Sequence, residues 1–165
     1  VPNTISDPIL QLLESDHIPW IFCNEGVKEI ETEGYYDSPQ FTHTVVEEDY
    51  VGHIPPVIQD LWKYILKTHP DVKDKFIKLY RIKCNMVTRG IDSAPHVPHL
   101  DRYTPHTVMI YYVNDSDGDT IIFDGQEQIS VAPQKGKYVI FDGNLKHCGT
   151  SPIKHNHRLL INFNF

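Results

Sequence analysis

With 165 residues, 40% of them hydrophobic and 22% charged, the chain has the size and composition of one ordinary globular domain. Its formal net charge of −7 argues against duplex nucleic acid as a partner, because phosphate binding needs clustered Lys and Arg. No apolar run approaches the length of a membrane span, no signal-peptide pattern opens the chain, and the cysteines form no CxxC pair. We therefore expect no membrane partner, and reduced thiols in a cytoplasmic protein.

Residues 1–75 are predicted to form a helical support and a lid. The apolar residues after Asp7-Pro8 predict a short helix with proline at its first position. A second helix is predicted from Pro55-Pro56, because apolar residues then recur every three or four positions along one stripe. This part also contains two predicted strands and the polar loop between them: residues 18–24, 41–47 and 25–40.

From residue 76 onward, short β-rich runs alternate with turn signals, a pattern typical of a β-sandwich or barrel. The predicted strands are residues 76–87, 107–114, 120–123, 128–131, 137–141 and 158–165. Strands that follow a helical start predict an α+β, mainly β fold: a cupin-like jelly roll, or double-stranded β-helix, with the N-terminal helices on one face. We expect residues 76–165 to be the core of a single domain that covers residues 1–165.

Three residues form a candidate metal centre. His99 and Asp101 are two positions apart, and in an extended segment such residues point to the same side. His147 follows the predicted strand 137–141 and would supply the third ligand. Two histidines and one carboxylate leave coordination positions open, which is the facial triad of non-haem iron(II) oxygenases. The pattern therefore predicts an iron site.

Arg158 begins the last predicted strand and is a candidate anion-binding residue, because a guanidinium can hold a carboxylate through two hydrogen bonds. Alternation along the strand places Leu160, Asn162 and Asn164 on the same face. Asparagines are unusual in a packed core but suit a polar pocket. We therefore expect this face to point into the site.

In order and spacing, the second half of the chain resembles the prolyl-hydroxylase branch of the 2-oxoglutarate/Fe(II) oxygenase superfamily. The matching segments are residues 99–101, 109–114, 117–123 and 133–142, followed by His147 and Arg158. The resemblance implies a double-stranded β-helix fold and a dioxygenase that hydroxylates a C–H bond. It also implies Fe(II), 2-oxoglutarate and O2 as reactants, succinate and CO2 as coproducts, and ascorbate as a candidate reductant.

The resemblance assigns roles to further residues. Those expected to contact 2-oxoglutarate are Arg158, Tyr112, Ile110, Thr120 and Asn162. Among them, Arg158 and Tyr112 would hold its distal carboxylate. Those expected to face the substrate are Arg102 and Tyr103.

The chain departs from the family's pattern at Arg158, at Asn85 and in the turn before Thr120, which lacks one glycine of the family's GGxT-like turn. Arg158 stands where collagen-type prolyl 4-hydroxylases have lysine, and so resembles the hypoxia-sensing enzymes. The family's tyrosine before the HxD motif is absent, and Asn85 is a candidate donor in its place. His96 is expected to lie in the loop 90–98 without binding the metal, and this loop and residues 25–40 are candidate lids.

A prolyl residue in a peptide or protein is the leading substrate that the resemblance implies. The alternatives are another residue, a free amino acid or a small metabolite. An AlkB-like nucleic-acid demethylase is disfavoured by the acidic charge and by the lack of a second arginine after Arg158. A non-catalytic cupin-type binding module would keep the fold without the chemistry. Acidic runs at residues 29–33 and 47–49 favour a neutral or basic substrate if they line the rim, and the oligomeric state stays open.

Overall fold

The last strand, β10 (His157–Asn164), lies at the centre of the fold because both of its faces are covered. In the computed structural model, which describes residues 1–24, 39–48 and 50–165, β10 pairs antiparallel with β4 (Arg81–Thr88) and with β5 (Thr107–Tyr112). Leu159, Ile161 and Phe163 point to one side, into the main hydrophobic core. The residues between them point to the other side, as the alternation predicts.

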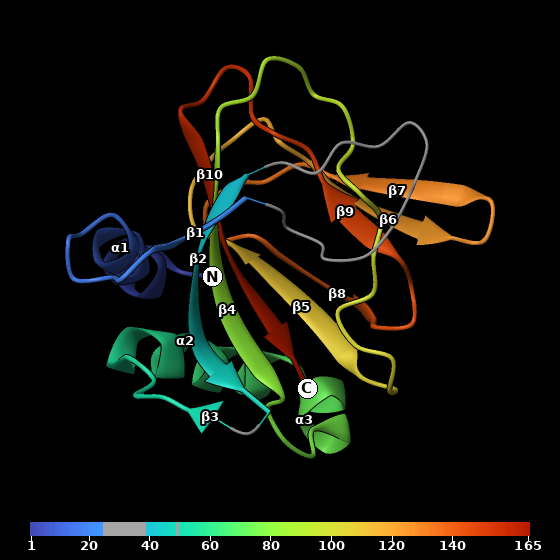
Figure 1. Ribbon diagram of the computed structural model, residues 1–165. Helices are drawn as coiled ribbons and strands as arrows, with labels where there is room; N and C mark the ends of the chain where they lie inside the picture. Colours follow the sequence, from blue (N-terminus) through green and yellow to red (C-terminus); the bar gives the residue numbers. More distant parts are fainter. Residues whose placement is uncertain (25–38, 49) are drawn as a thin grey trace.

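Two antiparallel sheets build the double-stranded β-helix, which confirms the predicted fold class (Figure 1). Their other strands are β1 (Ile21–Cys23), β2 (Gln40–Glu47), β3 (Tyr50–Val51), β6 (Thr120–Asp124), β7 (Glu127–Val131), β8 (Tyr138–Asp142) and β9 (His147–Gly149). The larger sheet has the order β1-β2-β4-β10-β5-β8, with β3 paired to β2, and the smaller sheet has the order β7-β6-β9. The side chains that carry the polar site lie between the two sheets.

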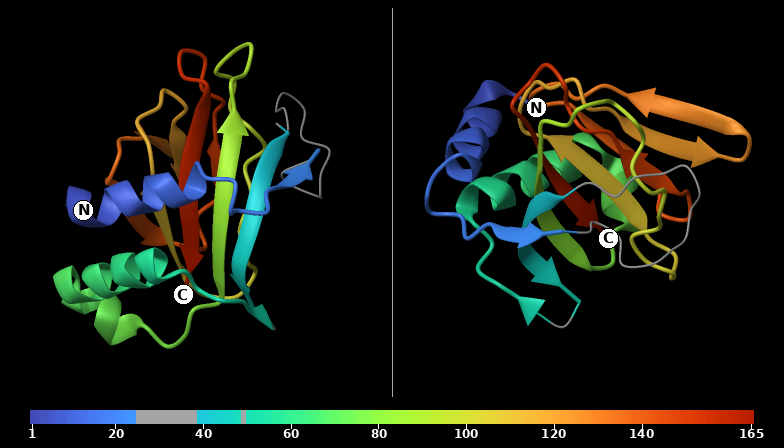
Figure 2. Two further views of the ribbon diagram at one scale, coloured as in Figure 1. Left: turned by 90° about the vertical axis from the view of Figure 1, so that its left-hand side faces the viewer. Right: turned by 45° about the horizontal axis from the view of Figure 1, so that its top comes forward.

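The helices α1 (Asn3–Leu13) and α2 (Pro56–Thr68) cover the opposite face of the larger sheet (Figure 2), while the short α3 (Pro70–Lys75) follows α2. The apolar stripe of α2 is buried, and its Trp62 ring stacks on Phe163 of β10 with centroids 5.5 Å apart. This packing anchors the strand whose other face lines the site. Of the helices in the described part of the chain, none has both the length and the apolar character that crossing a membrane requires.

The structure differs from the sequence-based expectation at the first helix. It begins at Asn3 and continues through Pro8, although proline was expected at its first position. Proline removes one hydrogen bond from a helix interior. Burial of Ile9 and Leu13 against the core offsets that loss, because each buried aliphatic side chain contributes about 1.5–3 kcal/mol.

Further differences from the prediction lie at β4, α3 and β9. Residues 76–80 precede the strand β4 instead of belonging to it, and both α3 and β9 were absent from the predicted elements. In addition, β2 from residues 1–75 pairs with β4 from residues 76–165. Such pairings join residues distant in sequence, so local patterns do not reveal them.

Candidate functional site

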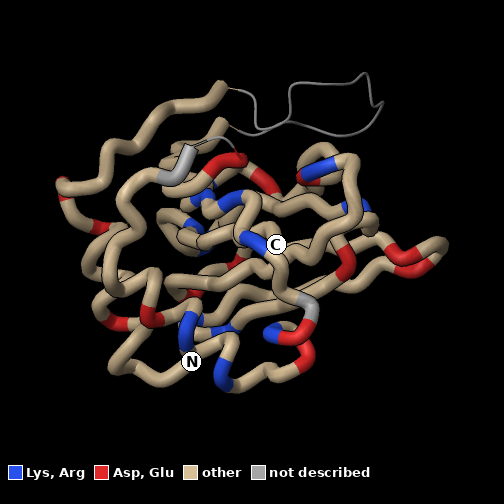
Figure 3. The backbone as a smooth tube through the Cα atoms, turned by 90° about the horizontal axis from the view of Figure 1, so that it is seen from below, with Lys and Arg blue, Asp and Glu red and all other residues tan. Residues whose placement is uncertain are grey.

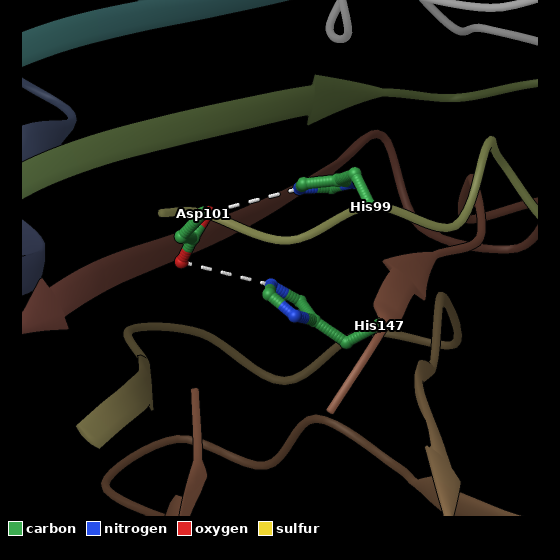
Figure 4. Close-up of side chains that lie close together, drawn as sticks. All are labelled: His99, Asp101 and His147. Carbon is green, nitrogen blue, oxygen red and sulfur yellow. Dashed lines mark ion pairs between the residues drawn. The ribbon is translucent and has the colours of Figure 1, made fainter. Parts of the chain in front are cut away.

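Backbone pairing brings the two candidate histidine ligands together. The His99 N–H donates to the His147 carbonyl at 3.0 Å, and the His147 N–H donates to the His99 carbonyl at 3.0 Å. His147 lies in the strand β9, and Asp101 is two positions beyond His99. The three side chains therefore converge between the sheets (Figure 4).

The ligand atoms leave space for an ion between them. The distance is 3.7 Å from His99 Nε2 to Asp101 Oδ1, and 3.7 Å from His147 Nε2 to Asp101 Oδ2. One ligand atom from each of the three residues lies within 4.8 Å of the others. The Val97 carbonyl lies 3.1 Å from His99 Nδ1, which favours the tautomer with its proton on Nδ1 and leaves Nε2 free to bind a metal.

Asp101 is held by one cation and two amides. Its Oδ1 forms an ion pair with Arg81 Nη2 at 2.6 Å, and its Oδ2 accepts from the amides of Asn162 and Asn164 at 2.9 Å each. Burial by itself would raise the pKa of Asp101, but Arg81, His147 and the two amides outweigh it and hold this pKa well below its usual range. The carboxylate is therefore ionised and fixed in orientation, as a metal ligand requires.

His147 is neutral at physiological pH. Its side chain is almost fully buried, and burial lowers its pKa to about 4 even though the Asp101 carboxylate acts in the opposite direction. A neutral imidazole is the form that binds a metal, so the site needs no deprotonation step at His147.

The metal-free protein is expected to lose stability as the pH falls from about 6.5 towards 4. In this window the unfolded chain protonates His147, whose ordinary pKa is 6.5, while the folded chain does not until about pH 4. The contribution is thus complete above pH 6.5 and decreases by up to about 1.4 kcal/mol per pH unit below it. Urea unfolding at a series of pH values, with a chelator present, measures this slope. A His147→Gln variant with an unchanged slope would contradict the assignment.

A cavity of about 430 Å³ opens beside the triad, lined by residues of β4, β5, β6 and β10. At its other end lies Arg158, which is only 2% exposed. Arg158 Nη2 donates to Thr120 Oγ1 at 2.7 Å, and Tyr112 Oη donates to the same oxygen at 2.8 Å. The structure thus brings together Arg158, Tyr112 and Thr120, as the resemblance implies.

Arg158 is a buried cation without an anionic partner in the described part of the chain. Its Nε has no hydrogen-bond partner there, and no carboxylate forms an ion pair with it. Burial lowers the pKa of this guanidinium, although Tyr112 and Asp119 oppose the shift. An uncompensated buried charge costs several kcal/mol, so this end of the cavity suits a ligand that brings a carboxylate.

The other predicted site residues divide into two groups. Ile110 and Asn162 line the cavity, but the Asn162 amide donates to Asp101, which makes it a positioning residue for the metal ligand. Arg102 pairs with Glu48 at 2.9 and 3.1 Å, and Tyr103 is 85% exposed. Neither Arg102 nor Tyr103 lines the cavity, and their contact with a substrate stays a prediction.

The two candidate lids and the residues His96 and Asn85 remain to be placed. Most of the segment 25–40 lies outside the described residues, whereas Gln40, His96 and Val97 line the cavity. His96 Nε2 lies 3.0 Å from Ser151 Oγ and is not part of the metal-binding group. Asn85, the candidate donor, also lines the cavity, and its buried Oδ1 has no described partner.

Arg81 is the site residue that the sequence analysis missed. It lies on β4 directly opposite Asn164 of β10, so both side chains reach Asp101 from neighbouring strands. A signal was present, because Arg81, Lys83 and Asn85 alternate with the apolar Ile82 and Cys84. Such alternation normally indicates a solvent-facing side, whereas here the polar face lines the cavity.

The sequence matches no protein-family model and no curated protein significantly. Solved structures, in contrast, share its fold over nearly the whole chain. An oxidoreductase of the 2OG-Fe(II) oxygenase family from Burkholderia pseudomallei has a TM-score of 0.68 at 12% identity, covering 96% of this chain and 76% of its own.

Two further solved structures have bound molecules. A prolyl hydroxylase from Trichoplax adhaerens, in complex with a hypoxia inducible factor peptide fragment, has a TM-score of 0.65 at 11% identity and covers 98% of this chain and 76% of its own. HygX from Streptomyces hygroscopicus, with nickel and 2-oxoglutarate bound, has a TM-score of 0.65 at 13% identity and covers 99% of this chain and 78% of its own. These likenesses establish the fold that the chain shares with them.

Proposed function

We propose that the chain is an Fe(II)- and 2-oxoglutarate-dependent dioxygenase that hydroxylates a C–H bond. The observation that carries this proposal is the pairing, in one cavity, of a histidine–aspartate–histidine group with a buried guanidinium that lacks an anion. The histidine–aspartate–histidine group suits a metal with open coordination positions, and the guanidinium suits the distal carboxylate of a dicarboxylic acid. A binding module without catalysis would not need both.

Each residue has a task in this proposal. His99, Asp101 and His147 would hold the iron, which when bound supplies the activation of O2 and oxidises 2-oxoglutarate to succinate and CO2. Arg158 would bind the distal carboxylate, with Thr120 beside it. The apolar wall at Ile110 would exclude water from the reacting groups.

The test separates binding from turnover. Calorimetry under nitrogen is expected to give tight 2-oxoglutarate binding only when Fe(II) is present, and aerobic incubation is expected to form succinate, detected by mass spectrometry. The His99→Ala variant should lose both signals. Binding without succinate would favour the cupin-type module, and absence of both metal and 2-oxoglutarate binding would contradict the proposal.

The resemblance and the fold shared with a prolyl hydroxylase support a prolyl residue in a peptide as the substrate. A free amino acid or a small acidic metabolite is the second candidate, because basic side chains line the cavity beside the metal-binding group. Mass spectrometry for products that gain one oxygen, on proline-containing peptides and on free amino acids, distinguishes the two.

Substituting Gly149 with alanine is expected to weaken 2-oxoglutarate binding by about tenfold while metal binding is retained. A Cβ at this position would lie 2.5 Å from Arg158 Nη1, so the guanidinium would have to move. A displaced guanidinium loses part of its two-point contact with a carboxylate. Calorimetry with the metal-loaded variant checks the affinity, and its metal content serves as the internal control. Wild-type affinity in both Gly149→Ala and Arg158→Met would mean that Arg158 does not hold 2-oxoglutarate.

A further inference from the structure

One wall of the cavity is formed by side chains in register on three neighbouring strands. Residues directly opposite each other in an antiparallel sheet share a face. Lys83 of β4 lies between Thr44 of β2 and Asn162 of β10, and Arg81 lies opposite Asn164. Lys83 therefore lies on the same side of the sheet as the residues that hold Asp101: it is two positions from Arg81 on β4 and directly opposite Asn162 of β10.

Lys83 differs from the other two cations of the cavity. Arg81 is paired with Asp101, and Arg158 is bound to Thr120 at the far end. Lys83 lines the cavity and is half-buried, yet its ammonium forms no hydrogen bond or ion pair with a described residue. Burial and the nearby Arg81 lower the pKa of Lys83, and Asp101 and Glu47 oppose them. A lysine at such a position is costly unless an anion joins it.

The proposed reactants do not neutralise this wall. A divalent metal and the two carboxylates of 2-oxoglutarate offset each other in charge. The described lining still contains three basic side chains, Arg81, Lys83 and Arg158, against the single carboxylate of Asp101. The excess is local, because the chain as a whole carries a net charge of −7 and its acidic and basic positions are interspersed along the described backbone (Figure 3).

Of the two acidic runs, residues 29–33 lie outside the described residues. In the second run, Glu48 pairs with Arg102, and neither Glu47 nor Glu48 lines the cavity. A neutral or basic substrate was expected because these runs are acidic. The wall beside the metal-binding group, in contrast, carries the basic side chains of Arg81 and Lys83.

We propose that the substrate carries a carboxylate that binds Lys83, with the neighbouring Asn85 as a second polar contact. This inference rests on the proposed oxygenase function and names the substrate class of the same site. Asn85 is the next inward-facing residue of β4, and it lines the cavity. The carboxylate can belong to a free acid or to an acidic residue of a peptide.

The test compares acids with their primary amides. One arm uses free amino acids, including proline, and the other uses proline-containing peptides with Asp or Glu against Asn or Gln. Ligand-observed NMR with protein carrying Co(II) and 2-oxoglutarate under nitrogen reports binding, and succinate formation with Fe(II) reports turnover. We expect at least one acid to bind about ten- to a hundredfold more tightly than its amide. A preference among the free amino acids would assign the carboxylate to a free acid, and a preference among the peptides would assign it to an acidic residue of a peptide.

The Lys83→Met variant, which removes the charge and keeps the length, should abolish this preference for acids, mainly through a higher KM. The Lys83→Arg variant should retain part of it. Lys78→Met, at an exposed lysine that precedes β4 and does not line the cavity, is the matched control. Equal binding of acids and amides to the wild-type protein, or an undiminished preference in Lys83→Met, would overturn the inference. Metal and 2-oxoglutarate binding by the wild type would leave the oxygenase proposal intact in that case.

Discussion

Replacing Asp101 with alanine is expected to abolish metal binding and, in addition, to lower the free energy of unfolding of the metal-free protein by about 3–5 kcal/mol. The carboxylate is buried, forms an ion pair with Arg81 and receives hydrogen bonds from Asn162 and Asn164. Without it, a largely buried guanidinium and two amides lose their acceptor. Breaking a buried ion pair by removing one partner leaves an uncompensated charge, which is the source of the large effect.

The matched control is His99→Ala, which should also lose the metal but cost about 1 kcal/mol or less in stability. The His99 side chain is 32% exposed, and among the described residues its Nδ1 is hydrogen-bonded to the backbone carbonyl of Val97. Urea unfolding with a chelator present, together with metal content after dialysis, measures both effects. Adding Arg81→Met to Asp101→Ala should recover part of the lost stability. Equal losses in Asp101→Ala and His99→Ala would refute the role given to the ion pair.

Exchanging Arg158 for methionine is expected to act in opposite directions on binding and on stability. The affinity for 2-oxoglutarate should fall about 30-fold or more, because truncating a buried charged partner costs about 2 kcal/mol or more. The metal-free, ligand-free protein should be as stable as the wild type or more stable, because a buried cation without an anionic partner is replaced by an apolar side chain of similar length.

Thermal and urea unfolding of the metal-free proteins checks the stability, and the same measurements on the metal-loaded proteins, with and without 2-oxoglutarate, check the affinity. In the wild type, a ligand concentration a hundred times Kd should add about 2.7 kcal/mol, and the methionine variant should show almost none of this at the same concentration. Arg158→Lys keeps the charge but loses the two-point contact, so its affinity should lie between the two. A ligand-free Arg158→Met protein that is clearly less stable than the wild type would mean that the guanidinium is structural.

Local patterns predicted those parts of the site that depend on one segment. The spacing of His99 and Asp101 needs only an extended backbone, and the inward face of β10 follows from alternation along one strand. The apolar stripe of α2 was likewise readable from its helical period. In each case the prediction depends on residues close together in sequence. The structure therefore differs from the prediction only in where these elements begin and end.

The features that escaped prediction depend on contacts between distant segments. Nothing local indicates that His147 forms a strand, because β9 has only three residues and pairs with β6. The role of Arg81 depends on its register with Asn164 across two strands. The alternation of polar and apolar residues along β4 would also fit a strand whose polar face is exposed to solvent. Only the packing of the two sheets against each other shows that the polar face of β4 lines the cavity.

The hydroxyl of Thr120 gives the far end of the cavity a selectivity of its own. Its oxygen accepts hydrogen bonds from both Arg158 and Tyr112, which occupy its two lone pairs. The hydroxyl proton must then point elsewhere, and the guanidinium offers only protons as well. An amide N–H that faces the guanidinium would meet another donor, while a carboxylate oxygen in its place would accept a hydrogen bond. This end therefore distinguishes an acid from its amide by hydrogen-bond polarity, even where the two have the same shape.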